Sequence, residues 1–205
     1  MTIHMKLLAG AMLVGITAMP LSAASFRYDA VLNGAQAVPS SPSKATGNAT
    51  LVVDDADETL DFTLAVDGIS IPDFAPSFDE GPLGPLHIHF GGVGQTGPVV
   101  IPFPRPSTLA GAGYVATATG FTLEALDYAY SDAVALSEST QANFTAASFD
   151  DFLAALDASD YYVNIHTTTV VSGEIRGQVS PVPLPAGAFL LLAGLGGLAA
   201  LRRRG

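Results

Sequence analysis

Histidines are the residues of this chain best suited to chemistry, and three of them fall in two short β-like segments. His87 and His89 alternate with apolar residues in one segment, and His166 ends the other, on the face that also carries Tyr162 and Asn164. Because residues two apart in a strand share a face, the apolar neighbours should meet the core and the imidazoles should point outward. If the two strands are neighbours, three imidazoles converge beneath long loops, where they could bind Cu²⁺ or Zn²⁺.

A simpler interpretation is that these histidines hydrogen-bond the backbone of nearby loops and bind no ion. A single His-x-His pair is common, but the two segments hold every histidine that follows the first 24 residues. Two alternatives therefore stay open. One is an exported binding or structural module, with or without a structural metal, and the other is a small copper- or zinc-binding metalloprotein.

No other arrangement of residues predicts catalysis. The chain has no cysteine, which excludes thiol catalysis and thiolate metal sites, and it lacks the Gly-x-Ser-x-Gly elbow of a serine nucleophile. The acidic turn at 54–58 does not start a calcium loop, because Thr59 and Ala65 stand where an EF-hand has Gly and Glu. Glu174 and Arg176 share a strand face, and we expect them to contact neighbouring strands or loop backbone. The protein is therefore predicted not to be an enzyme.

The elements that must position the histidines are short strands, indicated by alternating apolar residues and turn signals. Before the last two strands, residues 124–160 form an Ala- and Leu-rich stretch, in which Ser148 three residues before Asp151 predicts a helix at Phe149–Asp157. The pattern favours an all-β fold, a Greek-key β-sandwich with one short helix in an insert. The strands are expected at 26–32, 46–53, 59–66, 86–90, 99–101, 114–123, 161–166 and 173–179.

Residues 1–24 have the three parts of a secretory signal peptide. Lys6 precedes a short apolar run, and Ser22 and Ala24 are the small residues that favour cleavage after Ala24. The run is shorter than the roughly 20 residues that a membrane-spanning helix needs. We expect a signal helix that signal peptidase removes, so that the protein leaves the cytoplasm.

Residues 180–205 have the order of a membrane anchor. The uncharged stretch 185–201 is just long enough to span a bilayer as a transmembrane helix, and Arg202, Arg203 and Arg204 follow it. Under the positive-inside bias these arginines stay in the cytoplasm, so the rest of the chain lies outside. The two ends of the chain thus predict the same topology.

This tail resembles the VPLPA variant of the PEP-CTERM bacterial sorting signals. The resemblance is carried by Val182, Pro183, Leu184, Pro185 and Ala186, followed by the apolar stretch and the arginines. It implies recognition and cleavage by an exosortase-type membrane protease. Anchoring in the inner membrane would then be transient, and the mature protein would be periplasmic, at the cell surface or secreted.

Residues 25–179, between these two ends, are strongly acidic. They keep four basic and all 19 acidic residues, which gives a net charge of −15. Such a surface repels nucleic acid and anionic lipid, so nucleic-acid binding is excluded, and an unknown extracellular ligand or a cation is the expected partner. Without disulfides these about 155 residues must be held together by a hydrophobic core.

Residues 26–179 resemble the CHRD domain, named after chordin. The resemblance rests on HIHFG at 87–91 with GPVV at 97–100, and on YVNIHT at 162–167 with GEIRGQ at 173–178. It implies a β-rich extracellular module of a kind common in exported bacterial proteins. The His-x-His strand is also similar to that of copper–zinc superoxide dismutase. The chain has too few histidines for that enzyme's copper and zinc sites, so dismutase activity is not expected.

Overall fold

The computed structural model describes residues 24–105 and 112–183. The predicted signal helix and the predicted transmembrane helix both lie outside these residues. Within the two described ranges, no helix combines the length and the apolar character needed to cross a membrane.

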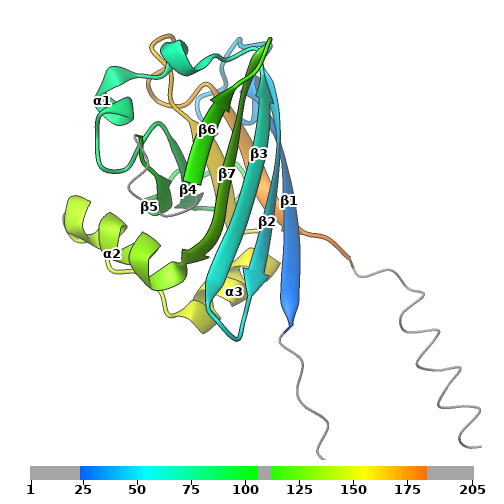
Figure 1. The fold of residues 1–205 in the computed structure, drawn as a ribbon, viewed down its shortest axis with the longest axis vertical. Helices are drawn as coiled ribbons and strands as arrows, with labels where there is room; N and C mark the ends of the chain where they lie inside the picture. Colours follow the sequence, from blue (N-terminus) through cyan, green and yellow to red (C-terminus); the bar gives the residue numbers. More distant parts are fainter. Residues whose placement is uncertain (1–23, 106–111, 184–205) are drawn as a thin grey trace, which may run out of the picture.

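Nine strands in the described part of the chain form one antiparallel sheet, whose two ends curl toward each other (Figure 1). Their order across the sheet is β5-β4-β8-β9-β1-β2-β3-β7-β6. In chain order the strands are β1 (Ser25–Asn33), β2 (Thr46–Asp54), β3 (Thr59–Asp67), β4 (Leu86–Phe90), β5 (Val99–Phe103), β6 (Ala112–Ala116), β7 (Gly120–Ala129), β8 (Tyr161–Ile165) and β9 (Ile175–Pro181).

The prediction of a mostly β fold is confirmed, but its two layers belong to one curled sheet rather than to a sandwich of two sheets. The last strand, β9, pairs with the first, β1, and so joins the two halves. Phe62 on β3 stacks on Phe103 on β5, with ring centroids 4.5 Å apart, although these strands lie near opposite ends of the sheet order. The accumulated twist of the strands lets the sheet fold over its own apolar face.

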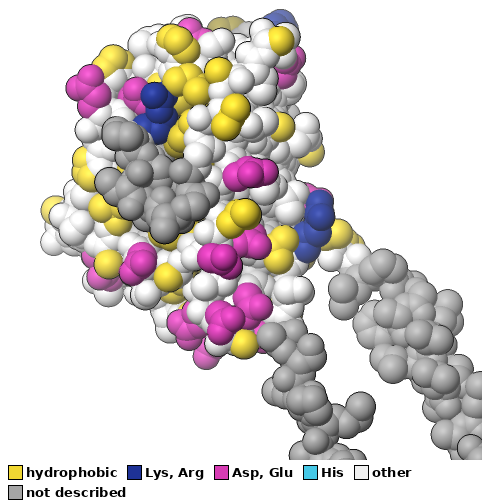
Figure 2. All heavy atoms as spheres, in the orientation of Figure 1, with side chains coloured by type: hydrophobic (Ala, Val, Ile, Leu, Met, Phe, Trp, Pro, Cys, Tyr) yellow, Lys and Arg dark blue, Asp and Glu magenta, His cyan; other side chains and the backbone are white. Residues whose placement is uncertain are grey.

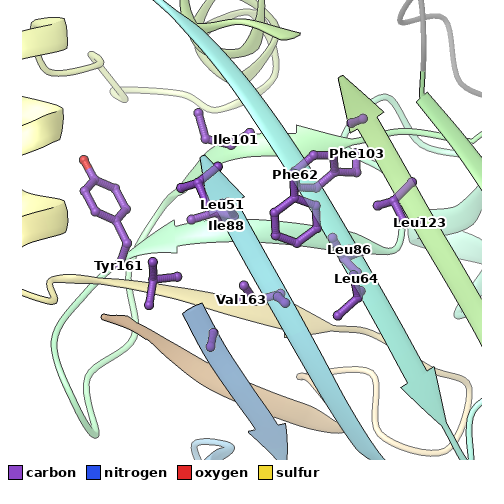
Figure 3. Packing of buried hydrophobic residues seen from close by; sticks show 14 of the residues in the cluster. Leu51, Phe62, Leu64, Leu86, Ile88, Ile101, Phe103, Leu123, Tyr161 and Val163 are labelled. Carbon is purple, nitrogen blue, oxygen red and sulfur yellow. The ribbon is translucent and has the colours of Figure 1, made fainter. Parts of the chain in front are cut away.

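The core lies between the two halves of the curled sheet. Along β3 the alternate residues Leu60, Phe62, Leu64 and Val66 are buried, whereas the residues between them are not. Apolar side chains of β4, β5 and β8 meet them from the other half, and Leu123 of the neighbouring strand β7 lies in the same core (Figure 3). The period-2 pattern in the sequence therefore decides which face of each strand is buried.

The segment 114–123, predicted as one strand, is a hairpin of β6 and β7. The Thr117 N–H donates to the Gly120 carbonyl at 2.9 Å, and the Gly120 N–H donates to Thr117 Oγ1 at 3.0 Å. A Cβ on Gly120 would lie 2.0 Å from the Val66 carbonyl oxygen, so the close approach of β7 to β3 requires glycine here. This turn has no proline or Asn-Gly pair to mark it in the sequence.

Three α-helices are present in the described ranges, where one had been predicted. They are α1 (Pro76–Asp79), α2 (Tyr130–Thr140) and α3 (Phe149–Asp157), and two short 3₁₀ helices occupy Gly34–Gln36 and Ile71–Asp73. α3 has the predicted bounds, and the Ser148 hydroxyl accepts from the Asp151 N–H at 3.2 Å as its N-cap.

α2 was not predicted from the sequence because the few residues that it buries do not form a hydrophobic stripe. Its buried residues are Tyr130, Ala133 and Ser137, which leave no hydrophobic stripe in the sequence. The Ser137 hydroxyl donates to the Val100 carbonyl at 3.0 Å, and the Gln141 side-chain amide bonds both the N–H and the C=O of Val99. α2 and the residue after it therefore cover the outer edge of β5, which would otherwise offer free backbone groups.

Candidate metal centre

His87, His89 and His166 lie together on the face of the sheet opposite the core. β4 and β8 are neighbours, with His87 across from Asn164 and His89 across from Tyr162. The His166 N–H continues this pairing, donating to the Pro85 carbonyl at 2.9 Å. One ring nitrogen of each histidine lies within 4.8 Å of a ring nitrogen of each of the other two. The strand alternation had predicted this face for all three imidazoles.

Loops and aromatic side chains cover the three imidazoles, which are 0% (His87), 8% (His89) and 6% (His166) exposed. Phe78 of α1 stacks on His166 with ring centroids 4.2 Å apart and meets His87 edge-on at 5.7 Å. Tyr162 stacks on His89 at 4.9 Å with nearly parallel rings. The histidine cluster, as we call His87, His89 and His166, is therefore a buried site with aromatic walls.

Each imidazole is bonded by one nitrogen to a loop carbonyl. The distances are 2.7 Å from His87 Nε2 to Gly84 O, 3.0 Å from His89 Nδ1 to Gly97 O and 2.7 Å from His166 Nδ1 to Val171 O. Because a carbonyl oxygen only accepts, each of these nitrogens carries the proton, and the tautomer of each ring is fixed. Such outer hydrogen bonds orient the histidines of metal sites.

The other nitrogen of each ring keeps a lone pair. His87 Nδ1 and His89 Nε2 are buried, and neither has a hydrogen-bond partner in the described residues. His166 Nε2 accepts from the Asn164 amide nitrogen at 3.3 Å. These are the atoms that a metal ion would use, since the opposite nitrogens are already occupied.

The electrostatic surroundings keep all three rings neutral. Burial is the largest cause in each case: it lowers the pKa of His87 well below its ordinary value, lowers that of His89 to about 4 and also lowers that of His166. For His89 the nearby Arg176 charge lowers the pKa further. The neutral imidazole is the form that binds metals, so the cluster is ready for an ion at neutral pH.

Two glycines place the carbonyls that fix the tautomers of His87 and His89. Gly84 has a φ of +77°, and a Cβ there would lie 2.0 Å from the Phe103 carbonyl oxygen. A Cβ on Gly97 would lie 1.9 Å from the Phe90 carbonyl oxygen. Only glycine lets these loops approach the sheet closely enough to bond the imidazoles.

Arg176 and Gln178 on β9 hold the loop 91–98 over the histidine cluster. The Arg176 guanidinium donates to the carbonyls of Gly92 and Gln95, and the Gln178 amide donates to the carbonyl of Gly91 at 2.9 Å. Arg176 therefore contacts loop backbone, as the sequence had predicted. Because the same loop supplies Gly97 O to His89, these residues position a candidate ligand.

Glu174 does not pair with Arg176. Its carboxylate accepts from the Ser43 hydroxyl at 2.6 Å and from the Thr167 hydroxyl. Both partners lie in segments beside the start of β9, so Glu174 joins loops that are far apart in the sequence.

Asn164 belongs to the site although it had not been predicted as a site residue. It is 6% exposed, and its Nδ2 contacts His166 Nε2 and the Ser172 carbonyl, each at 3.3 Å. Its Oδ1 is buried and has no hydrogen-bond partner among the described residues. The signal in the sequence was its position two residues before His166, on the same strand face.

The predicted sorting motif is only partly described. β9 runs to Pro181, and the Val182 N–H donates to the Arg27 carbonyl at 2.9 Å, so the chain leaves the sheet beside β1. Val182 and Pro183 are both exposed. The rest of the motif, Leu184, Pro185 and Ala186, lies outside the described residues, as do Arg202, Arg203 and Arg204.

The fold and the site together define a class of protein: an antiparallel β module with a buried histidine cluster under its loops. The CHRD domain matches residues 28–179, and the chain belongs to the CHRD family. This confirms the resemblance seen in the two histidine-bearing segments. Neither the curated proteins nor the solved structures include a significant match to this sequence.

Proposed function

We propose that the protein is an exported CHRD module that binds one copper or zinc ion through His87, His89 and His166, and that it works by binding rather than by catalysis. One observation carries the proposal. Three buried imidazoles have their tautomers fixed by loop carbonyls, and their ring nitrogens come within 4.8 Å of one another. CHRD is a family of binding and structural modules, which agrees with a role outside catalysis.

The size of the cluster suits an ion after a small contraction. A tetrahedral ion bonded to nitrogen at about 2.0–2.1 Å holds its ligand atoms about 3.3 Å apart. The 4.8 Å limit of the present spacing must therefore shorten by up to about 1.5 Å.

The alternative, in which the histidines only support the loops, accounts for one of the two nitrogens of each ring. It accounts for the three nitrogens that donate to carbonyls. It leaves His87 Nδ1 and His89 Nε2 buried without a partner, and an unsatisfied buried polar atom costs about 1–3 kcal/mol. A bound ion satisfies both atoms, which is why the metal site is favoured.

The export route is part of the proposal. Signal peptidase would cleave after Ala24, the helix at 185–201 would anchor the chain, and an exosortase-type protease would then process the tail. The acidic character suits an exported protein that gathers cations, and the face in Figure 2 carries many acidic side chains and few basic ones.

Elemental analysis of the exported protein tests the metal site directly. We expect one copper or zinc ion per chain, and we expect either ion to raise the unfolding temperature of chelator-treated protein. The triple variant His87→Ala, His89→Ala and His166→Ala should lose both effects, whereas Asn48→Ala, on an exposed position of β2, should keep them. Protein that carries neither metal and gains no stability from added copper or zinc would overturn the proposal.

A further inference from the structure

The histidine cluster has no negative charge beside it. Its three members stand without an aspartate or glutamate among the described residues that could share an ion with them. Their outer hydrogen bonds go to neutral carbonyls, and the walls formed by Phe78 and Tyr162 are uncharged.

The charged group that lies against the site is a cation. Arg176 is 2% exposed, its guanidinium carbon is 3.5 Å from the centre of the Tyr162 ring, and Tyr162 stacks on His89. No carboxylate in the part of the chain that the structure describes forms an ion pair with Arg176. The charged side chain that lies against the site therefore opposes the entry of a cation.

This distribution of charge disfavours the binding of a divalent ion more than that of a monovalent ion. The cost of burying an ion rises with the square of its charge, so a divalent ion costs about four times as much as a monovalent one of the same size. The repulsion from Arg176 is also twice as large for a divalent ion. Zinc sites commonly offset their charge with thiolate, carboxylate or bound hydroxide, and the described residues here offer three neutral nitrogens.

We infer that the centre binds copper(I) in preference to zinc(II), with His87, His89 and His166 as a three-coordinate ligand set. This inference rests on the proposed metal site. Imidazole suits copper as a ligand, and a singly charged ion needs fewer donors than Zn²⁺, which is almost always four-coordinate in structural sites. Three ligands in a plane at about 2 Å from the ion are about 3.5 Å apart, which requires less contraction of the cluster than a tetrahedron does.

Asn164 offers a way to change the charge at the site. Its Nδ2 is 3.3 Å from His166 Nε2, so Asn164→Asp places a carboxylate of nearly the same shape beside a ligand atom. The attraction between that carboxylate and the ion is twice as large for Zn²⁺ as for Cu⁺. The substitution should therefore shift selectivity toward zinc. Asn48→Asp, on an exposed position of β2, is the matched control.

The test measures both affinities on the purified full chain. Cu⁺ is titrated without oxygen, in the presence of ascorbate, against the chromophoric chelator bicinchoninate, and Zn²⁺ is titrated against a zinc-chelating dye. We expect the wild-type protein to bind one Cu⁺, to keep it against an equimolar amount of Zn²⁺, and to show a three-coordinate copper X-ray absorption spectrum. Asn164→Asp should lower the ratio of Cu⁺ to Zn²⁺ affinity by about tenfold or more, whereas Asn48→Asp leaves the ratio unchanged.

The outcomes distinguish the two claims. If zinc displaces Cu⁺ from the wild-type protein, the selectivity inference is wrong and the metal site stands. If neither ion binds, the proposed function itself fails. Should Asn164→Asp not fold, Arg176→Met removes the positive charge and must shift the ratio in the same direction, and an unchanged ratio there also overturns the inference.

Discussion

The guanidinium carbon of Arg176 lies 3.5 Å from the centre of the Tyr162 ring, so a buried positive charge rests on the aromatic wall of the histidine cluster. The cation is stabilised by this ring and by loop carbonyls in place of a carboxylate. Burying a guanidinium without a carboxylate partner costs free energy. Here the buried guanidinium holds the loop that orients His89.

Replacing Arg176 by lysine should loosen this loop. Lysine keeps the charge but loses the planar fork that bonds two carbonyls at once and stacks on Tyr162. We expect Arg176→Lys to lower the free energy of unfolding by about 2–4 kcal/mol and to weaken metal binding by about tenfold or more. Denaturant unfolding and metal titration measure the two effects. Arg27→Lys, whose side chain is 57% exposed and pairs with Asp29, should change stability by less than about 1 kcal/mol.

Gly173 is predicted to be needed for full stability because Asn164 packs against it. Its φ is +123°, and a Cβ there would lie 2.3 Å from both terminal atoms of the Asn164 amide. Gly173→Ala should therefore cost about 1–3 kcal/mol of stability and weaken metal binding. Gly94→Ala is the control, since Gly94 also has a positive φ but its Cβ would meet nothing within 4 Å. Equal losses in the two variants would show that backbone strain alone, and not the contact with Asn164, is responsible.

The metal-free protein should lose stability in mild acid. An unfolded histidine takes up a proton near pH 6.5, whereas burial holds the folded pKa of His89 at about 4, so between these values the unfolded state binds more protons. The unfolding free energy should thus fall as the pH decreases from about 7 to about 4, by on the order of 3 kcal/mol for His89. The buried Arg176 faces this ring and opposes its protonation. His89→Gln should flatten the pH profile, and an identical slope in that variant would contradict the assignment.

The two ends of the chain give a prediction about export. N-terminal sequencing of exported protein should begin at Ser25, and a mass spectrum should lack Arg202, Arg203 and Arg204. Deleting residues 188–205 should release the domain directly, because the uncharged helix is what would hold it in the membrane. Mature protein that starts at Met1 rules out the signal peptide. Mature protein that keeps the three arginines rules out processing of the tail but leaves anchoring intact.

The sequence by itself determined which way the key side chains point. Alternation is a local property of an extended backbone, so Leu86 and Ile88 assign one face of β4 to the core and leave His87 and His89 on the other. The start of α3 is equally local, because Ser148 caps the helix within its own first turn.

Only the tertiary structure decided what those side chains meet. The pairing of β4 with β8 joins residues about 75 positions apart in the sequence, and no periodic pattern specifies a strand's neighbour. The single curled sheet, the stacking of Phe78 on His166 and the carbonyls that fix each imidazole tautomer depend in the same way on distant segments. Chain geometry sets the direction of a side chain within a few residues, whereas its neighbours follow from how the whole core is packed.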